Sequence, residues 1–137
     1  MDYPTVLLAI DIWREAQNQT HDAKVGVGNV VCNRAAHPGW WGHTVVEVIT
    51  HKWQFTSMTG AGDPNLIKWP QETDPSWVDS LSAAQQVLAP HAEDNTGGAV
   101  YYYSTPLTTP PSAWGPVTET AQIGAMHFCK SIEKLDE

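Results

Sequence analysis

One glutamate stands where the first strongly apolar stretch of the chain ends, in the segment LAIDIWREAQNQT (8–20). On a helical wheel, Glu15 falls at the edge of a broad apolar face, beside Asp11. The last turn of a helix presents the negative end of the macrodipole, which disfavours a further negative charge. A carboxyl that keeps its proton there can protonate a leaving oxygen, as a general acid does. Two interpretations stay open: a general acid, or a boundary residue paired with Arg14 or Arg34.

Other catalytic patterns are missing from the sequence. His37, His43 and His51 are accompanied neither by an HExxH motif nor by paired cysteines, so we expect no metal site. The chain has no GxSxG segment, and neither cysteine lies in a nucleophile signature. The segment GVGNVV lacks the lysine and hydroxyl residue of a phosphate-binding loop. We therefore expect no cofactor.

Composition restricts the fold and the partners. A chain of 137 residues with 42% hydrophobic and 16% charged residues predicts one globular domain, 1–137. The net charge of −8 argues against nucleic acid as a partner, and no apolar run is long enough for membrane insertion. We expect a monomer. Cys32 and Cys129 could form one bridge, but we expect both to be small buried side chains.

Helix signals occupy most of the chain. Caps, prolines and apolar spacing predict helices over Pro4–Asn18, His21–Ala36 and Thr44–Lys52, and a further helix that begins at Pro75 after the N-cap Asp74. Residues 53–73 read as a long loop, a kind of segment that is often functional. The end of the chain, from residue 121 to 135, is predicted to form a last helix.

A short β element is predicted near residue 100. Gly97 and Gly98 supply a turn, and the tyrosine run that follows favours a strand. Because side chains alternate along a strand, Tyr101 and Tyr103 should share one face and Tyr102 should take the other. Helices with one small β element predict an α+β domain.

Five segments follow one another along the chain: LLAIDIWREAQNQ, AKVGVGNVVCNRA, VVEVITHKWQFTS, DNTGGAVYYYS and AQIGAMHFC. Together they resemble the cell wall hydrolase family of spore-cortex-lytic enzymes (the SleB-like family), whose catalytic domain cleaves peptidoglycan glycan strands. The resemblance covers roughly residues 5 to 129. It implies a mainly helical, lysozyme-like fold with a short β-hairpin near the substrate cleft.

The resemblance also implies roles for single residues. Glu15 matches the family's catalytic glutamate. Where the family has Glu-Ala-Arg-Gly-Glu, however, this chain has Glu-Ala-Gln-Asn-Gln, so Gln19 replaces the second acid. Asn33 and Arg34 match an Asn-Arg pair, although they could instead cap their helix. By position, the residues expected to bind substrate are Asn33, Arg34, Gln54, Phe55, Tyr101, Tyr102, Tyr103 and His127.

Hydrolysis of a glycan usually takes two carboxylates. Asp63 is the best candidate for a second carboxylate, followed by Asp94 and Glu47. One acid/base suffices if the 6-hydroxyl of muramic acid attacks its own anomeric carbon. We therefore favour a lytic transglycosylase over a muramidase, with cleavage between N-acetylmuramic acid and N-acetylglucosamine. The alternative is a non-catalytic glycan-binding or structural phage protein that keeps the fold.

The N-terminus carries no basic region and no small-residue cleavage site, so we expect no signal peptide. The expected setting is a phage endolysin that is made in the host cytoplasm and acts on the cell wall after release. A virion-associated wall-digesting protein is the alternative.

Overall fold

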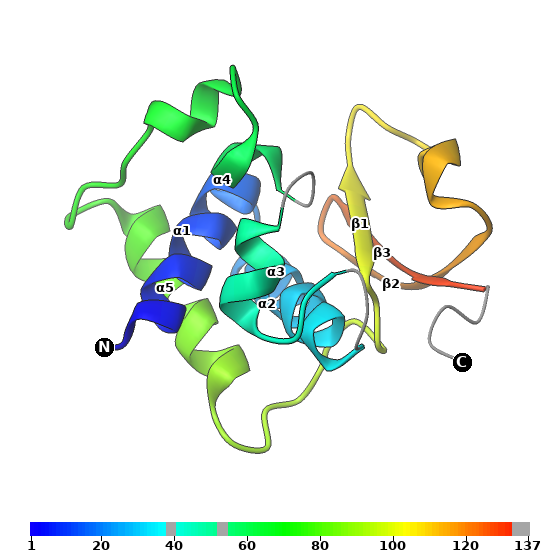
Figure 1. The fold of residues 1–137 in the computed structure, drawn as a ribbon, viewed down its shortest axis with the longest axis horizontal. Helices are drawn as coiled ribbons and strands as arrows, with labels where there is room; N and C mark the ends of the chain where they lie inside the picture. The colour runs from blue at the N-terminus through cyan, green and yellow to red at the C-terminus, as the bar shows by residue number, and fades with distance from the viewer. Residues whose placement is uncertain (38–40, 52–54, 133–137) are drawn as a thin grey trace.

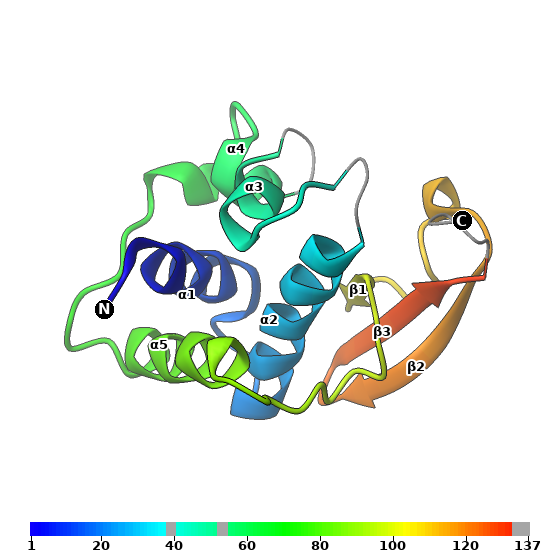
Figure 2. The same ribbon diagram turned by 60° about the horizontal axis from the view of Figure 1, so that its bottom comes forward.

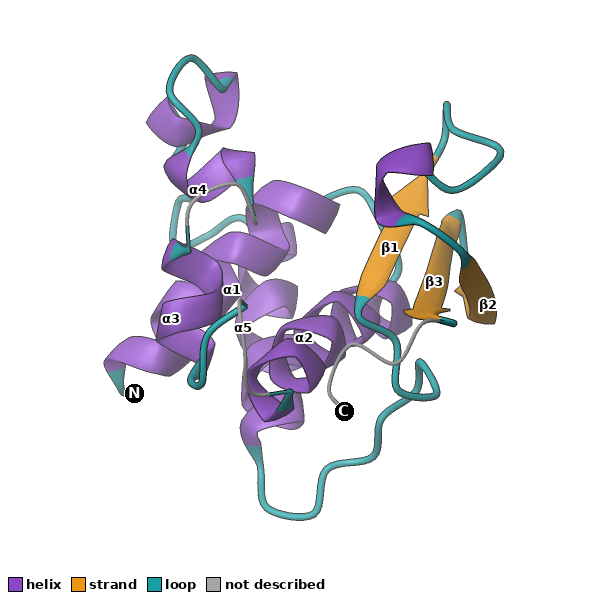
Figure 3. Ribbon diagram, turned by 45° about the vertical axis from the view of Figure 1, so that its right-hand side comes forward, coloured by secondary structure: helices purple, strands orange, loops and turns teal. Residues whose placement is uncertain are grey.

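The computed structural model describes residues 1–37, 41–51 and 55–132 (Figure 1). Helices come first along the chain and a small antiparallel sheet comes last, and the two stand on opposite sides of the molecule (Figure 3). This arrangement confirms the predicted α+β class. Within the described ranges, no helix is both long enough and apolar enough to cross a bilayer.

Helix α1 comprises Tyr3–Ala16 and carries Glu15 in its last turn. Asp2 is its N-cap: the side-chain carboxylate accepts a hydrogen bond of 3.1 Å from the backbone N–H of Thr5. The helix ends two residues before the predicted end at Asn18. Glu15 therefore lies where regular helix gives way to a turn.

Helix α2 comprises His21–Ala36, the range predicted from the sequence. It lies between the α1–α5 pair on one side and the sheet on the other (Figure 2). Its middle is buried all round, and Gly26 lets the ring of Phe128 approach the helix backbone. A Cβ atom at Gly26 would lie only 2.5 Å from Cζ of Phe128. The small residue therefore sets how closely the sheet packs on α2.

Helix α5 comprises Pro75–Leu88 and runs beside α1. Asp74 is its N-cap, as predicted, and also accepts a hydrogen bond of 3.0 Å from the indole Nε1 of Trp13. Near the same end, Lys24 donates to Asp79 at 3.0 Å. These polar contacts join α1, α2 and α5 around the apolar core.

Shorter helical segments lie beside the end of α1. Helix α3 comprises Val45–Thr50, with Thr44 as its N-cap. It begins one residue after the predicted start at Thr44 and ends two residues before the predicted end at Lys52. The predicted loop of 53–73 contains two helical turns, α4 (Thr56–Thr59) and the 3-10 helix η1 (Pro64–Ile67). That segment is therefore more ordered than its glycines and prolines suggested.

The sheet has the strand order β1-β3-β2, and both pairings are antiparallel. Strand β1 comprises Tyr101–Ser104, β2 Val117–Ile123 and β3 Met126–Ser131, and a 3-10 helix, η2 (Ser112–Trp114), precedes β2. The register places Tyr102 opposite Phe128. Both rings therefore lie on the same face of the sheet, where Phe128 packs against α2.

The predicted helix over 121–135 is wrong, because this part of the chain forms the end of β2 and all of β3. Residues 133–135 lie outside the described residues. Gly124, with a φ of 59°, provides the turn between the two strands. Met126 and Phe128 are buried while His127 between them is half-buried, the alternation of a strand. Over so short a segment, the apolar residues fit both the period of a helix and the period of a strand. The segment forms a strand because its backbone pairs with β1, which precedes it by more than twenty residues in the sequence.

Both cysteines are free thiols. Cys129 is buried in β3, and Cys32 is half-buried in α2. Burial, together with the charge of Asp94, raises the pKa of Cys32 to about 11. Neither thiol is therefore placed to act as a nucleophile.

We predict that Gly26→Ala weakens the packing of the sheet on α2. Overpacking typically costs about 1–3 kcal/mol, and the better helix propensity of alanine returns about 1 kcal/mol. The free energy of unfolding in urea should therefore fall by about 1–2 kcal/mol. Combining the change with Phe128→Leu should cost less than the sum of the two single changes. Full additivity would show that the two residues do not compete for space.

Candidate active site

The carboxylate of Glu15 accepts hydrogen bonds from two hydroxyl groups. Tyr102 donates through its phenol to Oε1 at 2.5 Å, and Ser57 donates through Oγ to Oε2 at 2.6 Å. Glu15 itself is only partly buried. A hydroxyl can donate to a carboxylate and can also accept from a protonated carboxyl. Both protonation states of Glu15 can therefore be hydrogen-bonded at the same place.

Three separate segments supply these groups: the end of α1, helix α4 and strand β1 (Figure 1). Along β1, Tyr102 faces Glu15, while Tyr101 and Tyr103 face the other way and contact Trp114. The prediction that Tyr101 and Tyr103 share a face is confirmed. The alternation of the strand therefore selects Tyr102, the central tyrosine, as the partner of Glu15.

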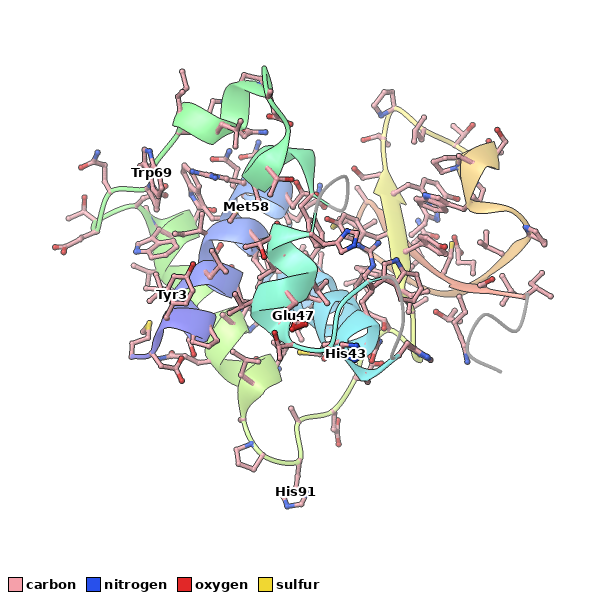
Figure 4. The ribbon with its side chains drawn as sticks, in the orientation of Figure 1. Tyr3, His43, Glu47, Met58, Trp69 and His91 are labelled. Carbon is pink, nitrogen blue, oxygen red and sulfur yellow. The ribbon has the colours of Figure 1, made fainter. Side chains whose placement is uncertain are left out.

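Arg14 holds the segment that presents Ser57. Its guanidinium is buried and donates to the carbonyl of Ser57 at 3.0 Å and to the carbonyl of Lys68 at 3.0 and 3.3 Å. Its Cζ also lies 4.7 Å from the ring centre of Trp69, and its Nη1 donates to Sδ of Met58 at 3.4 Å (both residues are labelled in Figure 4). Arg14 therefore anchors the region after residue 55 to the helix that carries Glu15.

Arg34 plays the matching role toward the sheet. From the end of α2, its Nε donates to the carbonyl of Val100 at 2.7 Å, directly before β1. Three aromatic rings lie within cation–π distance of its guanidinium: Trp41, Phe55 and Tyr101. Arg34 also interacts electrostatically with Glu15. It therefore places one buried positive charge near the carboxylate while it fixes the start of β1.

The environment of Tyr102 keeps its phenol protonated. Burial, the charges of Glu15 and Asp11, and the hydrogen bond to Glu15 raise the pKa of Tyr102 well above its ordinary range. Tyr102 therefore stays a neutral hydrogen-bond donor to Glu15 throughout the pH range in which an ordinary phenol is protonated. A carboxyl held in this way can accept and return a proton as a general acid and base.

Comparison with known proteins places the chain in a family. The model of the Cell Wall Hydrolase family matches residues 18–129. The chain belongs to the cell wall hydrolase family. The match begins at Asn18, just after Glu15, so it identifies the family without covering the glutamate itself. No curated protein sequence is significantly similar to the chain.

Two solved structures are similar to the chain. One is the catalytic domain of the Bacillus cereus SleB protein, at 26% identity over 93% of this chain and 89% of that chain, with a TM-score of 0.63. The other is the catalytic domain of the germination-specific lytic transglycosylase SleB from Bacillus anthracis, at 24% identity over 95% and 97%, with a TM-score of 0.67. These findings confirm the resemblance drawn from the sequence and the fold that it implied.

The other residues expected to bind substrate take different positions in this hydrolase. The amide nitrogen of Asn33 donates to the carbonyl of Ala99 at 2.8 Å and to Asp94 at 2.9 Å, so it ties α2 to the turn before β1. Phe55 is buried beneath Arg34. Gln54 lies outside the described residues. Substrate binding by Asn33 and Phe55 stays a prediction.

An aromatic cluster covers the sheet face opposite Tyr102. Tyr101 stacks on Trp114 with 4.6 Å between ring centres, and Tyr103 stacks on His127 at 4.7 Å. His127 in turn pairs with Glu119 through Nδ1 and Oε1 at 2.5 Å. The structure therefore brings the predicted residues Tyr101, Tyr103 and His127 together, but on the side of the sheet away from Glu15.

The predicted second carboxylates are engaged in local caps. Asp63 accepts from the backbone N–H of Asn65 at 2.8 Å, and Glu47 accepts from that of His43 at 3.0 Å. Asp94 accepts from Thr96, Gly98 and Asn33. Each group thus stabilises a turn, and a direct role in chemistry for any of them stays a prediction.

Two residues of the site were not singled out from the sequence. Ser57 lies in a segment without a motif, and nothing in its neighbours signals a partnership with Glu15. Asp11 is the carboxylate that interacts electrostatically with Glu15, and its place beside Glu15 on the helical wheel was a usable signal. In the described part of the chain, no three His, Cys, Asp or Glu side chains come together as a metal-binding group.

We predict that Tyr102→Phe lowers kcat/KM on purified peptidoglycan about 10- to 100-fold. The change removes one hydrogen bond to a charged group, worth about 1.5–3 kcal/mol, and keeps the ring. Release of soluble fragments measures the effect. The matched control is Tyr3→Phe, which removes an exposed hydroxyl at the far end of α1 (Figure 4). Equal activity of the two variants would exclude a role of the Tyr102 hydroxyl.

Proposed function

We propose that this cell wall hydrolase cleaves peptidoglycan glycan strands between N-acetylmuramic acid and N-acetylglucosamine, with Glu15 as general acid and base. The observation that carries the proposal is the pair of hydroxyl groups on the Glu15 carboxylate. The similar structure from Bacillus anthracis is that of a lytic transglycosylase, which supports the same substrate class.

We further propose an anhydro-forming cleavage. Protonated Glu15 gives its proton to the glycosidic oxygen as the bond from that oxygen to the anomeric carbon breaks. The 6-hydroxyl of the same muramic acid then attacks the anomeric carbon, and its proton passes to Glu15. Protonated Glu15 is thus restored, and the product carries a 1,6-anhydro ring.

The reason for preferring this route is the state of the other carboxylates. Hydrolysis needs a second carboxylate to activate water or to form a covalent intermediate. Asp63, Asp94 and Glu47 each accept hydrogen bonds from nearby backbone N–H groups, and Asp11 is fully buried. An internal nucleophile supplied by the substrate removes the need for a second carboxylate.

We predict that Glu15→Gln lowers the rate of glycan cleavage about 100- to 10,000-fold, the usual contribution of a general acid. Glutamine keeps the shape of the side chain but cannot transfer the proton. The matched control is Glu72→Gln, at an exposed glutamate on the surface. A non-catalytic wall-binding protein, the alternative function, would show no cleavage by the wild type and equal binding by all three proteins.

Mass spectrometry of the released muropeptides distinguishes the two types of cleavage. We expect products with 1,6-anhydro ends, one water lighter than the products of hydrolysis. The isotope ¹⁸O provides a second test, since no oxygen from solvent should enter the product. Products with free reducing ends that carry ¹⁸O would make the protein a muramidase and would require a second carboxylate.

A further inference from the structure

Asp11 is a buried carboxyl with no hydrogen-bond partner in the described parts of the chain. Its exposed fraction is 0%, and neither of its oxygens meets a donor or acceptor there. Burying a polar group in this way costs stability, and a leucine or an asparagine would avoid burying a charge. The catalytic scheme above leaves Asp11 without a task.

The position of Asp11 relates it directly to Glu15. The two carboxyls are four residues apart in α1, so they lie on the same side of the helix in adjacent turns. Each therefore senses the charge of the other, and they interact electrostatically. Asp11 is the deeper of the two, and Glu15 is the one that solvent can reach.

Opposing influences act on the proton of Asp11. Burial is the main influence that raises the pKa of Asp11 well above its ordinary range, and the charge of Glu15 raises it further. Arg34 from α2 and Arg14 from α1 act in the opposite direction, because their positive charges favour the carboxylate. Tyr102 from β1 also lies within electrostatic range and stays neutral. These are the charged and titratable groups that face Asp11 in the described ranges.

We propose that Asp11 is a positioning residue that shares a single proton with Glu15. At rest the proton is on Asp11, because the carboxylate of Glu15 accepts two hydrogen bonds and that of Asp11 accepts none in the described structure. In the active form the proton is on Glu15, and Arg14 and Arg34 stabilise ionised Asp11. The exchange conserves one proton and one negative charge in the pair. This inference rests on the proposed role of Glu15.

Sharing a proton changes how activity depends on pH. A lone general acid loses its protonated fraction about tenfold for each pH unit above its titration. In a pair that holds one proton, the fraction with the proton on the outer carboxyl does not depend on pH between the two macroscopic titrations. The amount of active enzyme should therefore stay constant over a window of pH, and Asp11 should be the cause of that plateau.

The test is the pH profile of kcat/KM for the wild type and for Asp11→Asn. We expect the wild type to be constant over about two pH units or more around neutrality, and the variant to fall about tenfold per pH unit over the same range. Asp11→Leu should behave like Asp11→Asn, and it provides a second variant if the amide disturbs folding. The matched control is Asp2→Asn, which removes a carboxyl from the other end of α1 and leaves a good N-cap. Identical profile shapes for the wild type and Asp11→Asn would overturn the proposal.

Stability provides a readout that does not depend on activity. Asp11 keeps its proton in the folded protein and loses it on unfolding, so its contribution to stability is complete below the ordinary aspartate range and declines as the pH rises. The ratio of the unfolding equilibrium constants, wild type over Asp11→Asn, should therefore rise about tenfold per pH unit above pH ~4. A constant ratio would show that Asp11 is ionised at rest and would overturn the proposal.

The two measurements together separate the possible failures. If Glu15→Gln remains active, the proposed function fails, whatever the stability experiment shows about Asp11. If Glu15→Gln is inactive and the stability ratio rises as expected, but the pH profiles keep the same shape, Asp11 is merely a buried neutral side chain. In that case the inference fails and the proposed function stands.

Discussion

The structure depends on holding one carboxylate between two hydroxyl groups from distant parts of the chain. Tyr102 lies 87 residues after Glu15, and Ser57 lies 42 residues after it. Hydrogen bonds of this length tolerate little movement of either partner. The segments that carry Glu15, Ser57 and Tyr102 must therefore keep fixed positions relative to one another, and the packing of the rest of the protein serves to fix them.

Two buried arginines do much of this work. Arg14 binds the carbonyl groups of the segment around Ser57, and Arg34 binds the carbonyl group next to β1. Each guanidinium donates to backbone carbonyl groups and lies against aromatic rings, and both kinds of contact partly compensate its buried charge. Arg34 interacts electrostatically with Glu15, and both arginines interact with Asp11, so the same residues organise the backbone and set the local electrostatics.

Local signals predicted the helices well. The caps read from the sequence, Thr44 and Asp74, mark the starts of α3 and α5, because a capping side chain satisfies backbone groups only a few residues away. Strand alternation also predicted which tyrosines share a face. The predicted terminal helix failed because its apolar spacing fits two periods, and only pairing with β1 decides between them.

The site itself was less predictable. The sequence, with the family resemblance, pointed to Glu15 and to the tyrosine run. Ser57 could not be found, because its role arises from a tertiary contact that leaves no periodic trace in the sequence. Asn33 shows the opposite problem: its position matches a family motif, while its amide holds a turn in this structure. Residue type and order indicate the chemistry that is available, and packing decides which groups meet.

The two hydroxyl groups on Glu15 also affect how a sugar can bind. Under the proposed mechanism, a glycosidic oxygen that takes the proton of Glu15 competes for it with the two hydroxyl groups, so the bound substrate exchanges one hydrogen bond for another. As the bond to the anomeric carbon breaks, that oxygen would become a stronger base and its contact with Glu15 would strengthen. Under that mechanism, the arrangement favours the transition state over the bound substrate.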